Sequence, residues 1–233
     1  MATSHLRQEQ FRRAILHSNG LGMSPLVQGD EFSRSRMYID TMEKFIVEST
    51  YLEATSLEPQ TLLLSDEEKD FFWQNSYPVH WEEIFGVRTR SAFCIQLYSH
   101  IEAIVADVAQ RIEIIGRCSA ITLSRETSLI KNHRAYFMAQ AQFEGPSEEQ
   151  WQQMTFLGHI RNAYVHNQGH SKKLTGNSDF DSFIESLPHV SLHGNFIDLK
   201  AGACTALLDI AERFYLALYK EYQKYQSIMR ALE

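Results

Sequence analysis

The segment 160–167, IRNAYVHN, places a guanidinium, an amide and an imidazole within six consecutive residues, at Arg161, Asn162 and His166. An imidazole exchanges protons readily near neutral pH and is the commonest general acid or base in proteins. A guanidinium pairs bidentately with a phosphate and offsets charge that develops on it during a reaction. Asn162 can orient either group or the phosphate. These residue types suit proton transfer at a phosphate ester, and we predict that all three are catalytic.

The helix that must position these side chains is predicted from its two ends and its apolar stripe. The sequence SEEQ at 147–150 has the pattern of an N-terminal capping box, and Gly169 supplies a left-handed end after residue 167 or 168. Apolar residues at helical spacing would hold this helix against the rest of the protein: Phe156, Leu157, Ile160, Tyr164 and Val165. Arg161, Asn162 and His166 fall off that stripe.

Helical geometry places Arg161 and His166, the two residues best suited to catalysis, on different faces of the helix. Asn162 and His166 are four residues apart and project from one face of a helix. Arg161 and His166 are five apart, so their Cβ directions diverge by about 140° at a step of roughly 100° per residue. The long arginine side chain, a distorted last turn or a second copy of the helix could bring the two groups together. We predict the last arrangement, with Arg161, Asn162 and His166 acting across the groove of a homodimer.

The segment resembles the signature of the HEPN superfamily of helical ribonucleases and nucleotide-binding domains, in which an arginine and a polar residue precede a histidine. Arg161, Asn162 and His166 fill those places in order, and an asparagine and a glycine follow, as is common in the family. The resemblance covers roughly residues 80–232. It includes a long preceding helix with an acidic residue, Glu102, and then the capped motif helix, a hairpin-like segment and the closing helix.

The resemblance implies a metal-independent endoribonuclease without a cofactor, usually dimeric and often a toxin or antiviral effector. In such an enzyme the 2′-hydroxyl of RNA attacks the neighbouring phosphate and leaves a cyclic phosphate end. His166 would exchange a proton with the nucleophile or the leaving oxygen, and Arg161 would bind the phosphate. Glu102 could hold the guanidinium in place from the neighbouring helix. RNA is then the expected substrate, and an antitoxin or another defence protein is a candidate partner.

Simpler interpretations remain open at the sequence level. Arginine and histidine near a helix C-terminus also complement the helix dipole and cap the last carbonyls, with no chemistry. In that case the chain is a regulatory adaptor in which the motif only caps a helix. Another alternative is a non-catalytic helical module that dimerises, binds a nucleotide or regulates a partner protein.

Histidine spacing raises the question of a metal site. His159, His166 and His170 would align on one continuous helix, but the helix is expected to end before His170, and neither an acidic residue nor a cysteine lies beside them. We therefore predict no metal site. Lys172 and Lys173, together with His170, are candidate RNA contacts, although a solvated loop also explains the two lysines.

The elements around the motif predict an all-α fold. Apolar residues at three- and four-residue intervals mark a long buried helix between residues 81 and 115. Other helices are predicted at 4–17, 30–55, 124–143 and 200–232, with a hairpin at 190–199, and the aromatic run FFW at 71–73 is expected in the core. We predict a HEPN-like helical bundle over residues 80–233 with one small β-hairpin before the last helix. Residues 1–79 form an N-terminal helical extension in this prediction.

Composition limits the remaining possibilities. Eleven Gly and five Pro in 233 residues favour long helices over the many turns of an all-β fold. The formal net charge of −7 argues against nonspecific coating of duplex nucleic acid but permits a local basic cleft. Three scattered cysteines predict reduced thiols, and neither a secretory signal nor a membrane-spanning run is evident. A cytoplasmic protein is the expectation.

Overall fold

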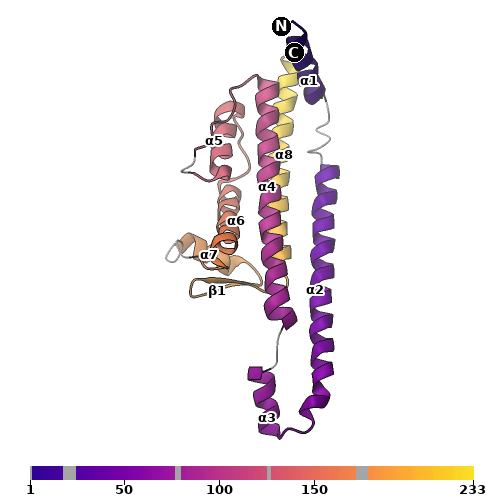
Figure 1. Cartoon of the computed structure of the whole chain (residues 1–233). Helices are drawn as coiled ribbons and strands as arrows, with labels where there is room; N and C mark the ends of the chain where they lie inside the picture. Colours follow the sequence, from indigo (N-terminus) through magenta and orange to yellow (C-terminus); the bar gives the residue numbers. More distant parts are fainter. Residues whose placement is uncertain (1, 18–24, 77–79, 125–126, 172–177) are drawn as a thin grey trace.

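The computed structural model describes residues 2–17, 25–76, 80–124, 127–171 and 178–233, and it is almost entirely helical (Figure 1). The elements in chain order are α1 (Ala2–His17), α2 (Pro25–Thr61), α3 (Asp66–Phe71), the π-helical segments η1 (Phe72–Ser76) and η2 (His80–Gly86), α4 (Val87–Gly116), α5 (Leu129–Ala141), α6 (Glu148–Asn167), α7 (Ser178–Ser186), β1 (Val190–His193), β2 (Phe196–Leu199) and α8 (Ala203–Ala231). The predicted all-α class with one small hairpin before the last helix is confirmed.

Two long helices, α4 and α8, pack side by side and form the centre of the molecule (Figure 1). Their facing stripes are apolar and almost fully buried, with Ile101, Val105 and Ile112 on α4 and Leu207 and Phe214 on α8 among the residues that exclude solvent. Helix α2 lies along one side of this pair, and α5, α6, α7 and the hairpin lie along the other. Burial of these stripes is the main source of stability, since each fully buried large apolar side chain contributes about 1.5–3 kcal/mol.

The N-terminal helices share this core. Phe32 and Ile39 of α2 are buried within it, and Arg36 joins α2 to α8 by an ion pair of 2.7 Å with Asp209. In α1, Nε of Arg12 donates to the carbonyl oxygen of Ile115 at the end of α4 (3.0 Å). Helices α1 and α2 therefore pack on the bundle, and the division at residue 79 stays a prediction.

Beyond the bundle, α2 continues to α3 and η1, where the packing is thin (Figure 1). α3 has no buried residue, and its Phe71 is 63% exposed. The expectation that the aromatic run 71–73 belongs to the core is therefore wrong for Phe71. A hydrophobic run is a poor guide to burial here, because α3 lies beyond the end of the α4–α8 pair (Figure 1).

Helix α5 begins five residues later than predicted, at Leu129 rather than Ser124. The Ser128 hydroxyl accepts the backbone N–H of Lys131 and caps the helix there. The Asn132 side chain also binds the backbone of Ser124, with Nδ2 donating to its carbonyl oxygen at 3.0 Å. This side-chain bond competes with an extension of the helix back to Ser124.

Helix α6 begins at the predicted capping box. The Ser147 hydroxyl accepts the N–H of Gln150, and the Gln150 side chain accepts the N–H of Ser147 in return. At the other end, Gln168 is the first left-handed residue (φ 52°) and Gly169 follows at φ 90°. The left-handed end was predicted at Gly169 and starts one residue earlier, and a Cβ at Gly169 would lie 2.7 Å from the Phe196 ring.

The hairpin fixes the end of α6. Strands β1 and β2 pair antiparallel and form the predicted hairpin, in which Val190 lies opposite Leu199. The Tyr164 hydroxyl of α6 donates to the carbonyl oxygen of Ile197 (2.6 Å), and the Ile197 N–H donates to the carbonyl oxygen of Gly169 (3.0 Å). These bonds hold the last turn of α6, which carries His166, against the hairpin.

One helical stretch in the described part of the chain, Trp81–Gly116, is long and apolar enough to cross a membrane by length and composition alone. Half of its most apolar window is buried inside the protein, as expected for the central helix of a bundle, so this is weak evidence for a membrane span.

Stability should fall in acid because the folded state disfavours several protonated imidazoles. Burial lowers the pKa of His100, His133 and His159 below the ordinary value of 6.5, and the charge of Lys131 lowers that of His159 further. The unfolded chain binds these protons first as the pH drops, so stability is fully present above about pH 6.5 and declines below it. Urea unfolding at several pH values measures this, and His159→Gln should make the decline shallower. A free energy of unfolding that rises between about pH 6.5 and pH 5 would contradict it.

Candidate functional site

The site begins with a close approach of α6 to α4. Gly158 is buried in the middle of α6, and a Cβ added there would lie 2.6 Å from the hydroxyl oxygen of Tyr98 on α4. Sequence reasoning missed this residue, and its signal was a glycine inside an otherwise regular helix. The missing side chain lets α6 lie directly on α4, and this brings Arg161, one turn further along, over the same face of α4.

Arg161 is half-buried where α6 lies on α4. Its positive charge acts on Cys94, Tyr98 and Glu102, which are four residues apart and share one face of α4. Burial raises the pKa of the Cys94 thiol to about 12, and the Arg161 charge opposes that rise. The prediction that Arg161 falls off the buried stripe of α6 is therefore wrong in part, because the side chain is half-buried.

Glu102 lies where the sequence predicts a supporting carboxylate, on the neighbouring helix within electrostatic range of Arg161. Partial burial raises the pKa of Glu102 above its ordinary value, and the Arg161 charge opposes that rise. Tyr98, whose pKa is raised by burial and by the Glu102 charge, lies in the same neighbourhood. Glu102 thus acts on Arg161 through space and partly neutralises a guanidinium that would otherwise be costly to bury.

The guanidinium of Arg161 is only partly satisfied. Nη1 donates to Oδ1 of Asn162 at 2.8 Å, whereas Nε is buried and has no hydrogen-bond partner. A buried donor without a partner costs about 1–3 kcal/mol, so this group is retained despite an unfavourable contribution. The bond to Asn162 turns the guanidinium toward the outer face of α6.

That outer face carries Asn162 and His166, which are both exposed and one turn apart. Val165 lies between Arg161 and Asn162 around the helix, and it is 41% exposed although it was predicted on the buried stripe. Among the described residues, the hydrogen bond of Arg161 goes to Asn162 and not to His166. One chain therefore brings Arg161, Asn162 and Glu102 together and leaves His166 apart from the guanidinium.

The remaining predicted residues separate from this group. His170 lies beyond the end of α6, where its Nδ1 is 3.1 Å from Oδ1 of Asn195 and its ring packs on Phe196. It is therefore not on the helix with His159 and His166. The described residues contain no group of three His, Cys, Asp or Glu side chains close enough to hold a metal ion. Lys172 and Lys173 lie outside the described residues.

A pocket that the sequence did not reveal lies beside α6. It has a volume of about 630 Å³ and opens between α5 and α6 near the start of α7. Its lining residues come mainly from α5 and α6: Ile130, Lys131, Arg134, Ala135, Met138, Glu148, Trp151, Gln152, Thr155, Phe156, His159 and Asp179. No local sequence pattern marks this pocket, because it forms only where α5 and α6 pack against each other.

Comparison of the chain with protein-family models, with curated proteins and with solved structures finds no match. The resemblance to the HEPN superfamily therefore rests on the motif and the order of the elements.

The Gly158 contact gives a direct test of how α6 is seated. Gly158→Ala should lower the free energy of unfolding by about 1–3 kcal/mol, since the new methyl group overlaps a buried tyrosine. Gly29→Ala in α2 is the matched control, because nothing lies within 4 Å of its Cβ position, and it should raise stability by about 0.5–1 kcal/mol. Urea denaturation of the two variants gives both values, and equal stabilities would show that α6 does not lie as close to α4 as the structure places it.

Proposed function

We propose that the protein is an endoribonuclease of the HEPN type whose active site contains Arg161, Asn162 and His166. The observation that carries this proposal is the placement of the three residues on the last two turns of α6. Arg161 is held against α4 with Nη1 bonded to Asn162, and Asn162 and His166 are open to a ligand. A helix cap requires neither the burial of the arginine nor the exposure of the other two.

The proposed reaction uses the 2′-hydroxyl of RNA as the nucleophile. Its oxygen attacks the adjacent phosphorus, the 5′-oxygen of the next nucleotide leaves, and a 2′,3′-cyclic phosphate remains. His166 moves one proton, either from the attacking hydroxyl or to the leaving oxygen, and water exchanges the proton at the other oxygen. Arg161 binds a non-bridging phosphate oxygen and offsets the charge that grows on it, and Asn162 orients the guanidinium.

A second copy of the chain completes the site in this proposal. Arg161 and His166 diverge around α6, and the hydrogen bond to Asn162 turns the guanidinium along its own helix. The exposed Val165 supplies an apolar contact beside the motif, where another α6 could pack. A twofold axis at that point would bring Arg161 of one copy to His166 of the other.

The cellular role proposed for this activity is that of a toxin or antiviral effector in the cytoplasm, restrained by an antitoxin or another defence protein. A net charge of −7 would repel RNA at long range, and recruitment by a partner would offset that repulsion. The second candidate function is a non-catalytic nucleotide-binding module, and the observation that favours it is the pocket between α5 and α6.

The decisive experiment is an RNA cleavage assay of the purified full chain on a short RNA, with chelator present. We expect cleavage in chelator and a cyclic phosphate product. An oligonucleotide that carries 2′-deoxyribose at the cleaved position is the matched control and should remain intact there. Cleavage of this control at the same bond, or cleavage that stops in chelator, would overturn the proposed mechanism.

A further inference from the structure

The pocket between α5 and α6 lies on the same face of α6 as the exposed part of the motif. Gln152, Thr155 and His159 line the pocket, and Asn162 and His166 continue the spacing of three and four residues toward the end of the helix. The axial rise from His159 to His166 is about 10 Å at roughly 1.5 Å per residue. A chain that contacts His166 and follows this face therefore reaches the pocket within two helical turns.

The pocket has the walls that a nucleobase requires. Trp151 and Phe156 are buried aromatic side chains that line it, and the exposed Met138 of α5 lines it as well. Aromatic and thioether groups of this kind contact the faces and edges of bases without strong preference for sequence. The Gln152 amide at the rim can donate and accept hydrogen bonds.

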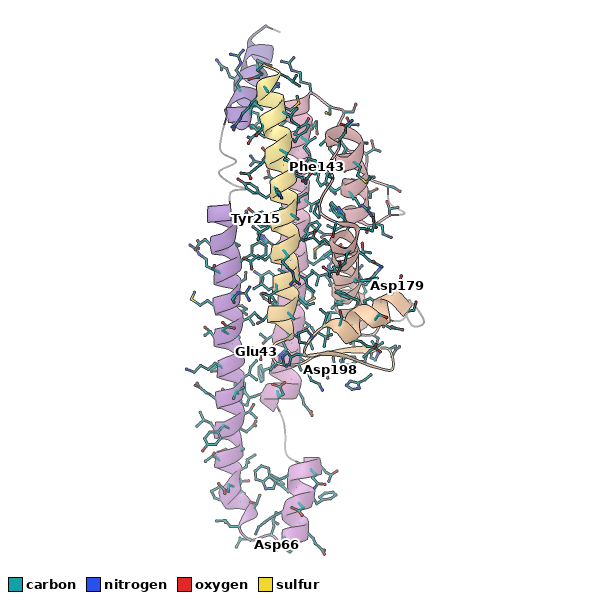
Figure 2. The ribbon with its side chains drawn as sticks, turned by 180° about the vertical axis from the view of Figure 1, so that it is seen from behind. Glu43, Asp66, Phe143, Asp179, Asp198 and Tyr215 are labelled. Carbon is teal, nitrogen blue, oxygen red and sulfur yellow. The ribbon has the colours of Figure 1, made fainter. Side chains whose placement is uncertain are left out.

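Charged side chains line the pocket, and their arrangement favours a phosphate group only at the end that carries Lys131. Lys131 makes no ion pair within the described part of the chain, and its charge acts on His159. The other cation, Arg134, is neutralised by an ion pair with Glu148. Asp179, at the start of α7 (Figure 2), also lines the pocket and is its second carboxylate after Glu148. Two cations and two carboxylates thus line the pocket, and the end at Lys131, whose charge acts on the His159 imidazole, is the one suited to a single phosphate group.

We propose that this pocket binds one nucleotide of the RNA strand that is cut at Arg161 and His166, an inference that rests on the proposed function. The base lies against Trp151 and Phe156, and its phosphate lies at Lys131. The pocket then fixes the register of the strand and determines which phosphodiester bond reaches His166. A free nucleoside phosphate has the same chemistry, and the experiment separates these two sources.

The test fills the pocket and measures binding apart from cleavage. Ala135→Trp places an indole in the pocket, and Ala139→Trp is the matched control, because Ala139 is exposed one turn further along α5 and does not line the pocket. The probe is a labelled 2′-O-methyl RNA hexanucleotide, which lacks the nucleophile and is read by fluorescence anisotropy. We expect Ala135→Trp to weaken binding about tenfold, as loss of one stacked base implies, and Ala139→Trp to change it less than about twofold.

Lys131 has a separate readout. Lys131→Ala should reduce the slope of log K against log salt concentration by about 0.7, the value for one phosphate contact on a single strand. Lys220→Ala, at an exposed position of α8, is the control and should leave the slope unchanged. An unchanged slope in Lys131→Ala would contradict the placement of the nucleotide phosphate at Lys131.

The outcomes distinguish the two proposals. If Ala135→Trp binds and cleaves RNA like the wild type, the strand does not enter the pocket and this inference is overturned, while the nuclease proposal stands. If Ala135→Trp loses binding of adenosine monophosphate but keeps hexanucleotide binding and cleavage, the pocket belongs to a free nucleotide, which also overturns it. If Ala135→Trp loses hexanucleotide binding while the wild type cleaves no RNA, the pocket is supported and the nuclease proposal fails.

Discussion

Mixing the Arg161→Ala and His166→Ala variants should restore about a quarter of wild-type RNA cleavage, although each variant alone is inactive. Random exchange of subunits makes half of the dimers mixed. In a mixed dimer one composite site has lost both residues, and the other keeps Arg161 from one copy and His166 from the other. If both residues instead act within one chain, every site in the mixture lacks one of them and no activity returns.

The single variants supply the baseline for that experiment. His166→Ala removes the proton-transfer group and should lower cleavage by about 10²–10⁴-fold. Arg161→Ala removes a charge that offsets the phosphate and should cost about 10²–10³-fold. Both should fold, because His166 is exposed and Arg161 already carries a buried Nε without a partner. Circular dichroism verifies this before the cleavage rates are compared.

A control separates complementation from trace wild-type activity. Mixing Arg161→Ala with the double variant Arg161→Ala/His166→Ala makes mixed dimers in which no site has both residues, so no activity should return. Activity in this control, or in either single variant, would show that the two residues are not the cleavage pair. A protein that cleaves RNA as a strict monomer would contradict the composite site in the same way.

The local structure around the motif could be predicted because short-range rules determine it. The capping box at Ser147, the end of α6 near Gly169 and the hairpin from Val190 to Leu199 each depend on neighbours within a few residues. The long buried helix was also predictable, since its apolar residues recur at helical spacing over many turns. Caps, turns and apolar periodicity depend on residues that are near one another in the chain, so a single sequence is enough to predict them.

Tertiary features were predictable only in part. Helical angles identified the divergence of Arg161 from His166, but not that Arg161 would turn toward Cys94, Tyr98 and Glu102, since that depends on how closely α4 and α6 approach. The glycine that permits the approach is uninformative without knowledge of its neighbour. The pocket beside α6 depends on the same packing, which is why no motif marked its residues.

The largest stability effect should come from Arg90, whose guanidinium is buried at the foot of the bundle. Its exposed fraction is 1%, and all five of its N–H groups donate hydrogen bonds. Nε and Nη2 bind the two carboxylate oxygens of Glu43 on α2 (2.8 and 2.7 Å), and Nη1 and Nη2 bind those of Glu82 on η2 (2.7 and 3.1 Å). Nη1 also donates to the carbonyl oxygen of Leu199 on β2 (3.2 Å).

This arrangement joins four elements through one side chain. Helix α4 carries Arg90, and α2, η2 and β2 each supply an acceptor, so the hairpin that steadies the end of α6 is tied to the N-terminal helices. Figure 2 shows Glu43 of α2 and Asp198 of β2 at the same level, beside the end of α4. The two carboxylates hold the pKa of Arg90 well above its ordinary value, and its charge is retained despite burial.

Arg90→Met should therefore lower the free energy of unfolding by about 3 kcal/mol, at the low end of the range for breaking a buried ion pair. The low end applies because the Glu82 side chain is 41% exposed and regains water, whereas that of Glu43 is only 17% exposed. Arg90→Lys keeps the charge but not the planar fork, so it should lose less. Urea denaturation gives these values.

Neutralising the partners provides the matched test. In the Arg90→Met background, Glu43→Gln and Glu82→Gln remove the two unpaired carboxylates, and stability should recover in part because an uncompensated charge near the core is the largest cost. Arg36→Met, which breaks a more exposed pair with Asp209 and Glu212, should cost less than about 1 kcal/mol. If Arg90→Met costs no more than Arg36→Met, the guanidinium does not join these elements, and the hairpin must be held to the bundle by its apolar contacts and its hydrogen bonds to the end of α6.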